Sequence, residues 1–375
     1  MAAAERDAPA LAVAVRAGLA PDDDYAGLGR PPCDWDDPGA REALVDALVR
    51  DAQAALAVLC GQELTGLPAE AAQLLALVAG QDAEAGEDGV FRIARRVARD
   101  RVISTVDTEA RHGHKSRARR FDGYKTHLGV DPDDELITNV AVTAANTPDR
   151  DVIDDLLDEP ASSSETGDAD QADADEPGLD EPGTAGEQPA AGLEVYGDSA
   201  YADGQTLREQ AERGNDLRAR VPPVRNSRGY SKDQFTIDPQ AGTVTCPARH
   251  TVPIRPQRRG GQARFGDLCR SCPLRAACTT ARAGRVISIH PQEAALQHAK
   301  ARQRDPDWQQ AYRTHRPIVE RKISHFTRRP WGGRKARCRG RARILTDVLT
   351  RAGVINLARL ATLGLQHGPR GWAIA

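Results

Sequence analysis

The sequence predicts a mixed α/β protein, and two patterns support this class. Apolar residues recur every three or four positions over residues 37–78, the spacing of a helix that buries one face. The pattern then changes, because three short segments rich in β-branched residues follow between residues 102 and 142. Helical spacing returns later, over residues 201–213, 303–325 and 342–363.

Two helices are expected in the first part of the chain. The first begins at Asp36-Asp37-Pro38, because proline is tolerated in the first helical turn and acidic side chains favour the positive end of a helix. The segment from Gln62 to Gly66 breaks the pattern, and the apolar spacing resumes from Ala71 to Ala79.

Three strands are expected next, at Val102–Val106, Tyr124–Val130 and Leu136–Val142. The turn-forming run that starts at Asp131-Pro132 separates the last two, so we expect them to pair as a hairpin. A helix is expected to begin at residues 151–157. A short buried strand at residues 193–200 then ends in a polar turn.

Charge is unevenly distributed along the 375 residues, although the formal net charge is only −3. Residues 161–191 are acidic and nearly free of large apolar groups, so we expect a disordered insert. Residues 300–351 instead carry sixteen Lys or Arg against four Asp or Glu, which indicates a cationic surface. No apolar stretch is long enough for a membrane span, and the first residues do not resemble a secretory signal, so a cytoplasmic protein is expected.

Four of the seven cysteines are clustered in sequence, at Cys246, Cys269, Cys272 and Cys278. A C-x-x-C pair can place two sulfurs on one side of a tight turn, and four thiolates suit a structural Zn²⁺. His250 could replace one ligand. Buried free thiols remain the alternative, and a disulfide is the least expected outcome in a reducing compartment.

Three carboxylates suit a divalent ion site, because Mg²⁺ prefers hard oxygen ligands held by rigid elements. Asp107 follows the first predicted strand, Asp198 follows the strand near residue 197, and Glu320 lies on a predicted helix. Each also has a simpler interpretation, since a strand-end Asp commonly forms a turn and a helical Glu beside Arg commonly forms an exposed ion pair.

Several motifs together resemble the catalytic domain of bacterial insertion-sequence DDE transposases. They are GDSAY at residues 197–201, YRTHRPIVER at residues 312–321, the later RCRGRAR and VINLARLATLGL, the segment VISTVDTEARHGHKSRARRFDGYKTHLGVD, and the CP…CxxCPLRxxC insert. Each motif alone is weak, whereas their common order is specific.

The resemblance implies a ribonuclease H-like fold, with a mixed five-stranded sheet flanked by helices. It implies N-terminal helices and an inserted cysteine-containing subdomain as well. It also implies two Mg²⁺ or Mn²⁺ ions held by Asp, Asp and Glu, which cleave DNA at the element ends and join it to a target. The second Asp corresponds to Asp198, and the family's Y-R-E signature falls on Tyr312, Arg316 and Glu320.

The first Asp departs from the family pattern, because no Asp-Gly-Thr or Asp-Ser-Thr tripeptide occurs. Either Asp107, which Thr108 follows, is the first ligand, or the chain is a front-truncated copy that lacks it. The expected function is an insertion-sequence transposase, which is active as an enzyme only if the first carboxylate is present. The alternatives are an inactive remnant that only binds DNA, and a nuclease that does not join strands.

A run of basic residues is expected to bind double-stranded DNA, both element ends and target, because guanidinium groups pair with phosphates. A solvated charged face is the simpler alternative. A nucleoid-associated protein with no membrane partner is expected, and a homodimer on DNA would fit. The run comprises Arg328, Arg329, Arg334, Lys335, Arg337, Arg339, Arg341 and Arg343.

These features suggest six segments. They are an N-terminal helical remnant (1–90), the first part of the ribonuclease H-like domain (91–160), the acidic insert (161–191), the second part of that domain (192–219), the cysteine-containing insertion (220–300), and the C-terminal helices with Glu320 and the basic loop (301–375).

Overall fold

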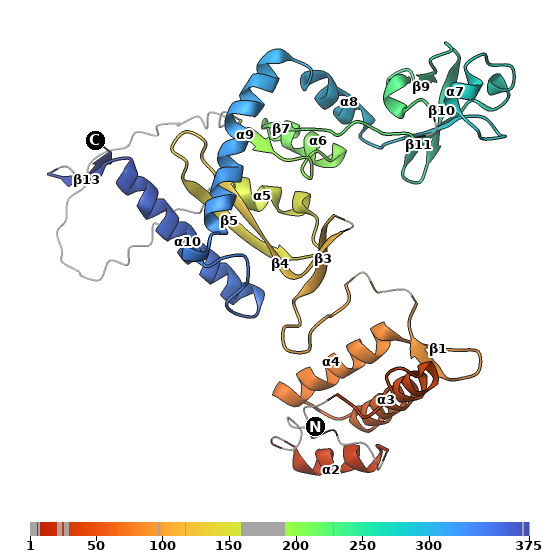
Figure 1. Cartoon of the computed structure of the whole chain (residues 1–375), viewed down its shortest axis with the longest axis vertical. Helices are drawn as coiled ribbons and strands as arrows, with labels where there is room; N and C mark the ends of the chain where they lie inside the picture. Colours follow the sequence, from red (N-terminus) through yellow and green to blue (C-terminus); the bar gives the residue numbers. More distant parts are fainter. Residues whose placement is uncertain are drawn as a thin grey trace, which may run out of the picture. The chain divides into compact units, whose positions relative to one another are not determined.

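The computed structural model describes residues 6, 8–20, 25, 30–95, 98, 100–116, 118–158, 192–227, 229–369 and 371–374. The acidic insert expected at residues 161–191 lies outside this part of the chain. Two compact units are present (Figure 1). The first comprises Met1–Lys125, Val142–Asn146 and Cys338–Ile344, and the second comprises Thr126–Ala141, Thr147–Arg337 and Leu345–Ala375.

The first unit begins with helices. Asp37 caps the second of these, because its side chain accepts hydrogen bonds from the backbone N–H groups of Gly39 and Ala40. The helix start predicted at Asp37-Pro38 and the break before residue 66 are therefore confirmed. A short antiparallel pair follows the helices. The elements are α2 (Pro9–Ala17), α3 (Pro38–Leu59), α4 (Gly66–Asp82), β1 (Ala83–Ala85) and β2 (Phe91–Ile93).

A three-stranded sheet follows, with strand order β3-β4-β5. It comprises β3 (Arg111–Ser116), β4 (Arg119–Val130) and β5 (Ile137–Ala144). The neighbouring strands predicted at residues 124–130 and 136–142 are confirmed as β4 and β5, which the predicted turn joins.

The prediction of a strand at Val102–Val106 is wrong, because these residues form no strand. The Ser104 hydroxyl accepts the backbone N–H groups of Val106 and Asp107, at 3.2 and 3.1 Å. Such a local bond offers the backbone an alternative to a strand ladder. Val102 is buried, but the Val106 side chain is 65% exposed, so the end of the run gains little from burial. The third strand of the sheet is instead β3.

A parallel pair lies in the second unit, where β6 (Glu194–Gly197) pairs with β7 (Asp216–Ala219). Helix α6 (Gly204–Glu212) connects them, and it packs with α5 (Ile153–Leu157) and α8 (Glu293–Arg302) around a small apolar cluster. The short helix η1 (Asp149–Val152) precedes α5. The strand predicted at residues 193–200 is confirmed, but it is shorter than predicted. It is also less buried, because only Gly197 of β6 is fully buried.

The cysteine-containing segment forms a separate five-stranded antiparallel sheet, with strand order β12-β11-β10-β9-β8. Its core includes Val244 and Ala263, both 0% exposed. The elements are η2 (Lys232–Gln234), β8 (Thr236–Asp238), β9 (Thr243–Thr245), β10 (Thr251–Gln257), β11 (Gly260–Arg264), η3 (Gly266–Cys269), α7 (Arg275–Cys278) and β12 (Val286–Ile289).

The C-terminal part is mainly helical, as predicted at residues 303–325 and 342–363. Helix α9 packs against β6 (Figure 1). None of the helices in the described residues is long and apolar enough to span a bilayer. The elements are α8 (Glu293–Arg302), α9 (Pro306–Phe326), η4 (Arg329–Trp331), α10 (Arg341–Thr362), β13 (Leu365–Gly368) and β14 (Gly371–Ile374).

The mixed α/β class is thus confirmed, whereas the expected mixed five-stranded sheet differs from what the described residues form. The strands assigned to the catalytic domain fall into the β3-β4-β5 sheet and the β6-β7 pair. The five-stranded sheet is antiparallel and lies in the cysteine segment, where short hairpin connections favour antiparallel neighbours.

Candidate active site and nucleic-acid interface

Tyr312 ties α9 to the end of β6. Its buried hydroxyl donates a hydrogen bond to the Gly197 carbonyl, at 3.0 Å. Its ring stacks on Trp308, with ring centroids 5.0 Å apart. One turn further along α9, His315 contacts the Tyr196 ring, at 4.6 Å between centroids. These contacts place α9 beside the residue that follows β6, which is Asp198.

Asp198 opens the turn between β6 and α6. Its Oδ1 accepts the backbone N–H of Ala200 at 2.8 Å, and its carbonyl accepts that of Tyr201 at 3.2 Å. A Cβ added at Gly197 would lie 3.2 Å from the Tyr201 side chain, so glycine allows this ring to fold back on the strand end. Asp198 is therefore a turn-forming residue, as its simpler interpretation supposed, and it is only half-buried.

The charges near Asp198 affect the pKa values of two tyrosines, Tyr201 and Tyr312. Burial raises the pKa of Tyr201, the charges of Asp149 and Asp198 raise it further, and Arg316 opposes them. Burial likewise raises the pKa of Tyr312, which Arg316 lowers and Asp198 raises. Asp198 and Arg316 therefore act on the same two side chains, which places a carboxylate and a guanidinium in one polar cluster at the end of β6.

Glu320 lies on the same face of α9 as Tyr312 and Arg316, because the three residues are spaced by four. Its side chain is 66% exposed, and the Arg316 Nη2 lies 3.7 Å from its Oε1. Arg316 itself is mostly buried, with 14% of its side chain exposed. This long, open ion pair contributes little to stability, so Glu320 keeps a carboxylate available to solvent and ligands.

Asp107 lies in the first unit, in the loop that replaces the predicted strand. The Tyr124 hydroxyl donates a 2.5 Å hydrogen bond to its Oδ1. Burial raises the pKa of Tyr124, and the Asp107 charge adds to this effect. The residues described above around Asp198 belong to the second unit.

The oxygen donors of this cluster fit a hard divalent cation in kind, because carboxylates are the ligands that Mg²⁺ and Mn²⁺ prefer. Asp198 and Glu320 supply two of them. Within the part of the chain that the structure describes, no three His, Cys, Asp or Glu side chains are grouped so that they could hold a metal ion. A complete set of three carboxylates is therefore not assembled here.

The basic loop between α9 and α10 is anchored by Arg351, a buried cation of α10. Arg351 donates to the Gly333 carbonyl at 3.0 Å and pairs with Asp347 at 2.5 Å. Gly332 adopts a φ of 107°, and a Cβ there would lie 2.5 Å from the Arg351 guanidinium. Only glycine permits this close approach.

Anchoring leaves the loop cations exposed. Of those predicted to bind DNA, Arg337 also pairs with Asp347, and the Arg341 backbone N–H donates to Glu109 at 2.8 Å. The charged side chains of the run are exposed, so they can reach the phosphates of DNA. The exposed members are Arg328, Arg329, Arg334, Lys335, Arg337, Arg339, Arg341 and Arg343.

One polar contact was not predicted from sequence. Lys322 of α9 is buried, with 4% of its side chain exposed, and its Nζ lies 3.5 Å from Glu135 Oε2. Arg321 pairs with the same carboxylate. Glu135 has a φ of 56°, a left-handed conformation in the turn between β4 and β5. A lysine next to an arginine resembles an exposed helix face in sequence, so no pattern signalled this pair.

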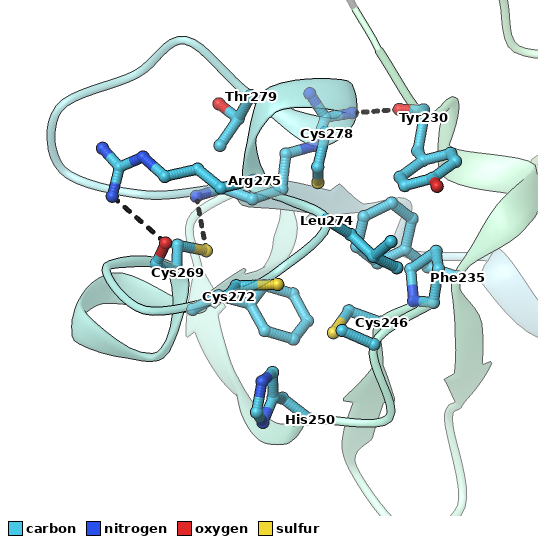
Figure 2. A pocket seen from close by; sticks show the side chains of 14 residues that line it. Tyr230, Phe235, Cys246, His250, Cys269, Cys272, Leu274, Arg275, Cys278 and Thr279 are labelled. Atoms are coloured by element: carbon cyan, nitrogen blue, oxygen red, sulfur yellow. Dashed lines mark hydrogen bonds between the residues drawn. The ribbon is translucent and has the colours of Figure 1, made fainter.

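The four cysteines predicted as a cluster converge on one small pocket of the β8–β12 sheet. Cys246, Cys269, Cys272 and Cys278 all line it, together with His250 (Figure 2). All four are free thiols.

A helix that carries Tyr312, Arg316 and Glu320 beside a strand-end aspartate, followed by a cationic loop, is an arrangement suited to a DNA-processing protein. Comparison with known families agrees: residues 245–361 match the family described as "Transposase DDE domain". The matched residues span the cysteine sheet from Thr245, all of α9, the basic loop and most of α10. The resemblance to insertion-sequence DDE transposases is thereby confirmed. No curated protein and no solved structure matches the chain.

Proposed function

We propose that this chain is a DNA transposase that cleaves the ends of an insertion sequence and joins them to target DNA. The observation that carries the proposal is the hydrogen bond from Tyr312 to Gly197. It brings the helix matched by the transposase family next to Asp198, a residue outside the matched segment. Family resemblance and geometry thus point independently to one cluster.

Asp198 and Glu320 would hold Mg²⁺ or Mn²⁺. When bound, such ions activate the attacking oxygen and stabilise the leaving oxygen of a phosphodiester. Tyr312 positions α9 through its hydrogen bond, and Arg316 orients Glu320 and supplies positive charge for a phosphate. Asp107 is the candidate for the first carboxylate, although its Oδ1 accepts the Tyr124 hydroxyl in this structure.

The basic loop would bind the DNA backbone. Exposed guanidinium groups on an anchored loop neutralise phosphates without reading sequence, so this contact explains affinity rather than specificity. Double-stranded DNA, both element ends and target, is therefore the proposed partner, with a homodimer as the assembly that brings two ends together. A ribonuclease H-like fold, the six-segment domain organisation and a nucleoid-associated cytoplasmic location complete the proposal.

The test is a plasmid assay with the full chain and DNA that carries the sequences flanking its gene. We expect strand cleavage and joining with Mg²⁺ or Mn²⁺. Asp198→Asn and Glu320→Gln should each reduce cleavage by at least about a hundredfold, the scale of losing one preorganised electrostatic group. DNA binding should persist in both variants. Asp267→Asn is the matched control, because its side chain is 88% exposed on η3.

A DNA-binding remnant without catalysis is the second candidate, and one observation favours it: the described residues contain no group of three His, Cys, Asp or Glu side chains placed to hold a metal ion. Binding of duplex DNA with no nicking under either divalent ion would establish this alternative. Nicking without strand joining would instead indicate a nuclease.

A further inference from the structure

We propose that the β8–β12 sheet holds one structural Zn²⁺ ion through Cys246, Cys269, Cys272 and Cys278. This site is separate from the carboxylate cluster, and its role is to stabilise the fold. The inference does not depend on the proposed transposase activity.

The four sulfurs come from three backbone segments that surround one pocket. Cys246 follows β9, Cys269 ends η3 with Cys272 three residues later, and Cys278 ends α7. Figure 2 shows their side chains around the same small cavity. Ligands from separate turns are what a structural metal ion crosslinks, because each turn alone has too little apolar surface to order itself.

The backbone around two of these cysteines forms tight turns. At Cys246, the backbone N–H of Arg249 donates to the Cys246 carbonyl at 2.8 Å, and Cys246 N–H donates to the His250 carbonyl at 2.9 Å. Arg249 takes a left-handed φ of 62° to close this turn. At Cys269, the backbone N–H of Arg285 donates to the sulfur itself, at 3.3 Å.

The charges that line the pocket also fit this ion. Four thiolates with Zn²⁺ leave a charge of −2. Arg275 and Arg285 line the pocket and can offset it.

The pocket is not a closed ligand set as it stands, since no three candidate ligands among the described residues meet the geometry of a bound ion. Cysteine has a single rotatable bond before its sulfur. Because the backbone segments already line one cavity, closing the set requires side-chain rotation rather than refolding.

The sheet is small, and two of the cysteines belong to its core. Strands β8 and β9 have three residues each. Two of the ten buried core residues are Cys269 and Cys278 themselves. A small sheet with short strands commonly requires a metal ion or a disulfide to fold stably. The same cysteines could form a disulfide instead, and His250 could replace one of them, so the experiment separates these cases.

The experiment measures metal content of the full chain, purified under reducing conditions without chelators. We expect one Zn²⁺ per chain, and a strong reduction in Cys246→Ser, Cys269→Ser, Cys272→Ser and Cys278→Ser. Cys33→Ser and Cys60→Ser are matched controls and should retain the ion. His250→Ala should retain it too. Loss of zinc in His250→Ala, or equal zinc in the cluster and control variants, would overturn the four-cysteine site.

A second measurement covers variants that fail to fold. The wild-type chain is stripped of metal and titrated with Co²⁺, whose absorption identifies tetrahedral sulfur coordination. We expect strong sulfur-to-cobalt charge-transfer bands, which zinc should abolish. No such spectrum, or fewer than the seven free thiols of the sequence in the metal-free protein, would overturn the proposal. Neither readout involves DNA, so failure here is distinguishable from failure of the proposed function.

Discussion

Two regions of the second unit offer different donor atoms in different surroundings. At the end of β6, the donors are carboxylate oxygens, and the Glu320 side chain is 66% exposed. In the β8–β12 sheet, the donors are sulfurs, and Cys269 and Cys278 are 8% and 9% exposed. Exposed oxygen donors suit an exchangeable ion that contacts a substrate. Buried sulfur donors suit a permanently bound structural ion.

The two regions also differ in what stabilises them. Helix α9 is joined to β6 and to the β4–β5 turn by polar contacts from Tyr312 and Lys322. The β8–β12 sheet packs around an apolar core, with Phe265 2% exposed and Val244 0% exposed. The proposed catalytic cluster is thus positioned by single hydrogen bonds and ion pairs. Their removal should alter its geometry more than it unfolds the chain.

The largest expected effect comes from removing metal. Stripping zinc should destabilise the β8–β12 sheet by several kcal/mol, because binding energy at a structural site is folding energy. Withholding Mg²⁺ should leave the melting temperature unchanged and abolish only cleavage. Thermal unfolding followed by circular dichroism, with and without each ion, checks both. If removing Zn²⁺ and withholding Mg²⁺ change the melting temperature equally, the two regions do not differ in the way proposed.

Removing Lys322 should have the next largest effect. Lys322→Met leaves the partly buried Glu135 with Arg321 as its cation, and we expect a loss of about 2 kcal/mol, below the range for a fully buried pair because Arg321 remains. Urea unfolding measures this loss. Lys300→Met is a matched control in a more exposed ion pair, with 20% of the Lys300 side chain exposed, and should cost less.

Tyr312→Phe should have the third largest effect. It deletes the hydroxyl that binds the Gly197 carbonyl and so removes one buried hydrogen bond, at a cost of about 1 kcal/mol. Cleavage should fall by a larger factor than stability implies, because α9 is no longer held beside Asp198. Tyr230→Phe, in the cysteine sheet, is the control for aromatic substitution. Equal cleavage by both variants would remove Tyr312 from the site.

A pH titration should show a smaller effect. Burial raises the pKa of Glu135, but its hydrogen bond to Arg321 and the charges of Arg321 and Lys322 outweigh this, so the net pKa is lowered. A lowered folded-state pKa contributes stability that is present above the unfolded value of 4.5 and is lost as pH falls through the folded value. Stability measured from pH 6 downward should therefore fall less steeply in Glu135→Gln, and an identical slope would contradict this contribution.

The smallest expected effect concerns the basic loop. Arg334→Ala should lower DNA affinity modestly for all sequences and reduce the slope of log affinity against log salt by about 1. Arg258→Ala, on the turn between β10 and β11, is the control. If the slope of log affinity against log salt is unchanged, Arg334 is a solvated charge that does not contact DNA.

Local sequence determined the elements whose signals act over a few residues. Asp37 and Pro38 start α3 because a side-chain cap needs only its own helix, and the turn after residue 130 joins β4 to β5 for a similar reason. The resemblance to a known family placed a signature on Tyr312, Arg316 and Glu320, and their spacing of four puts them on one face of α9. The assignment of Val102–Val106 as a strand failed because strand formation depends on partners elsewhere in the chain.

Only the tertiary structure decided which distant groups meet. The hydrogen bond from Tyr312 to Gly197 spans 115 residues, and no local pattern encodes it. Lys322 is buried beside Glu135 because packing of α9 places it there, although its sequence neighbours suggest an exposed face. Propensity, capping and turns act between near neighbours, whereas burial and ion pairing depend on the completed fold, which is why the site's residues could be named from sequence and their contacts could not.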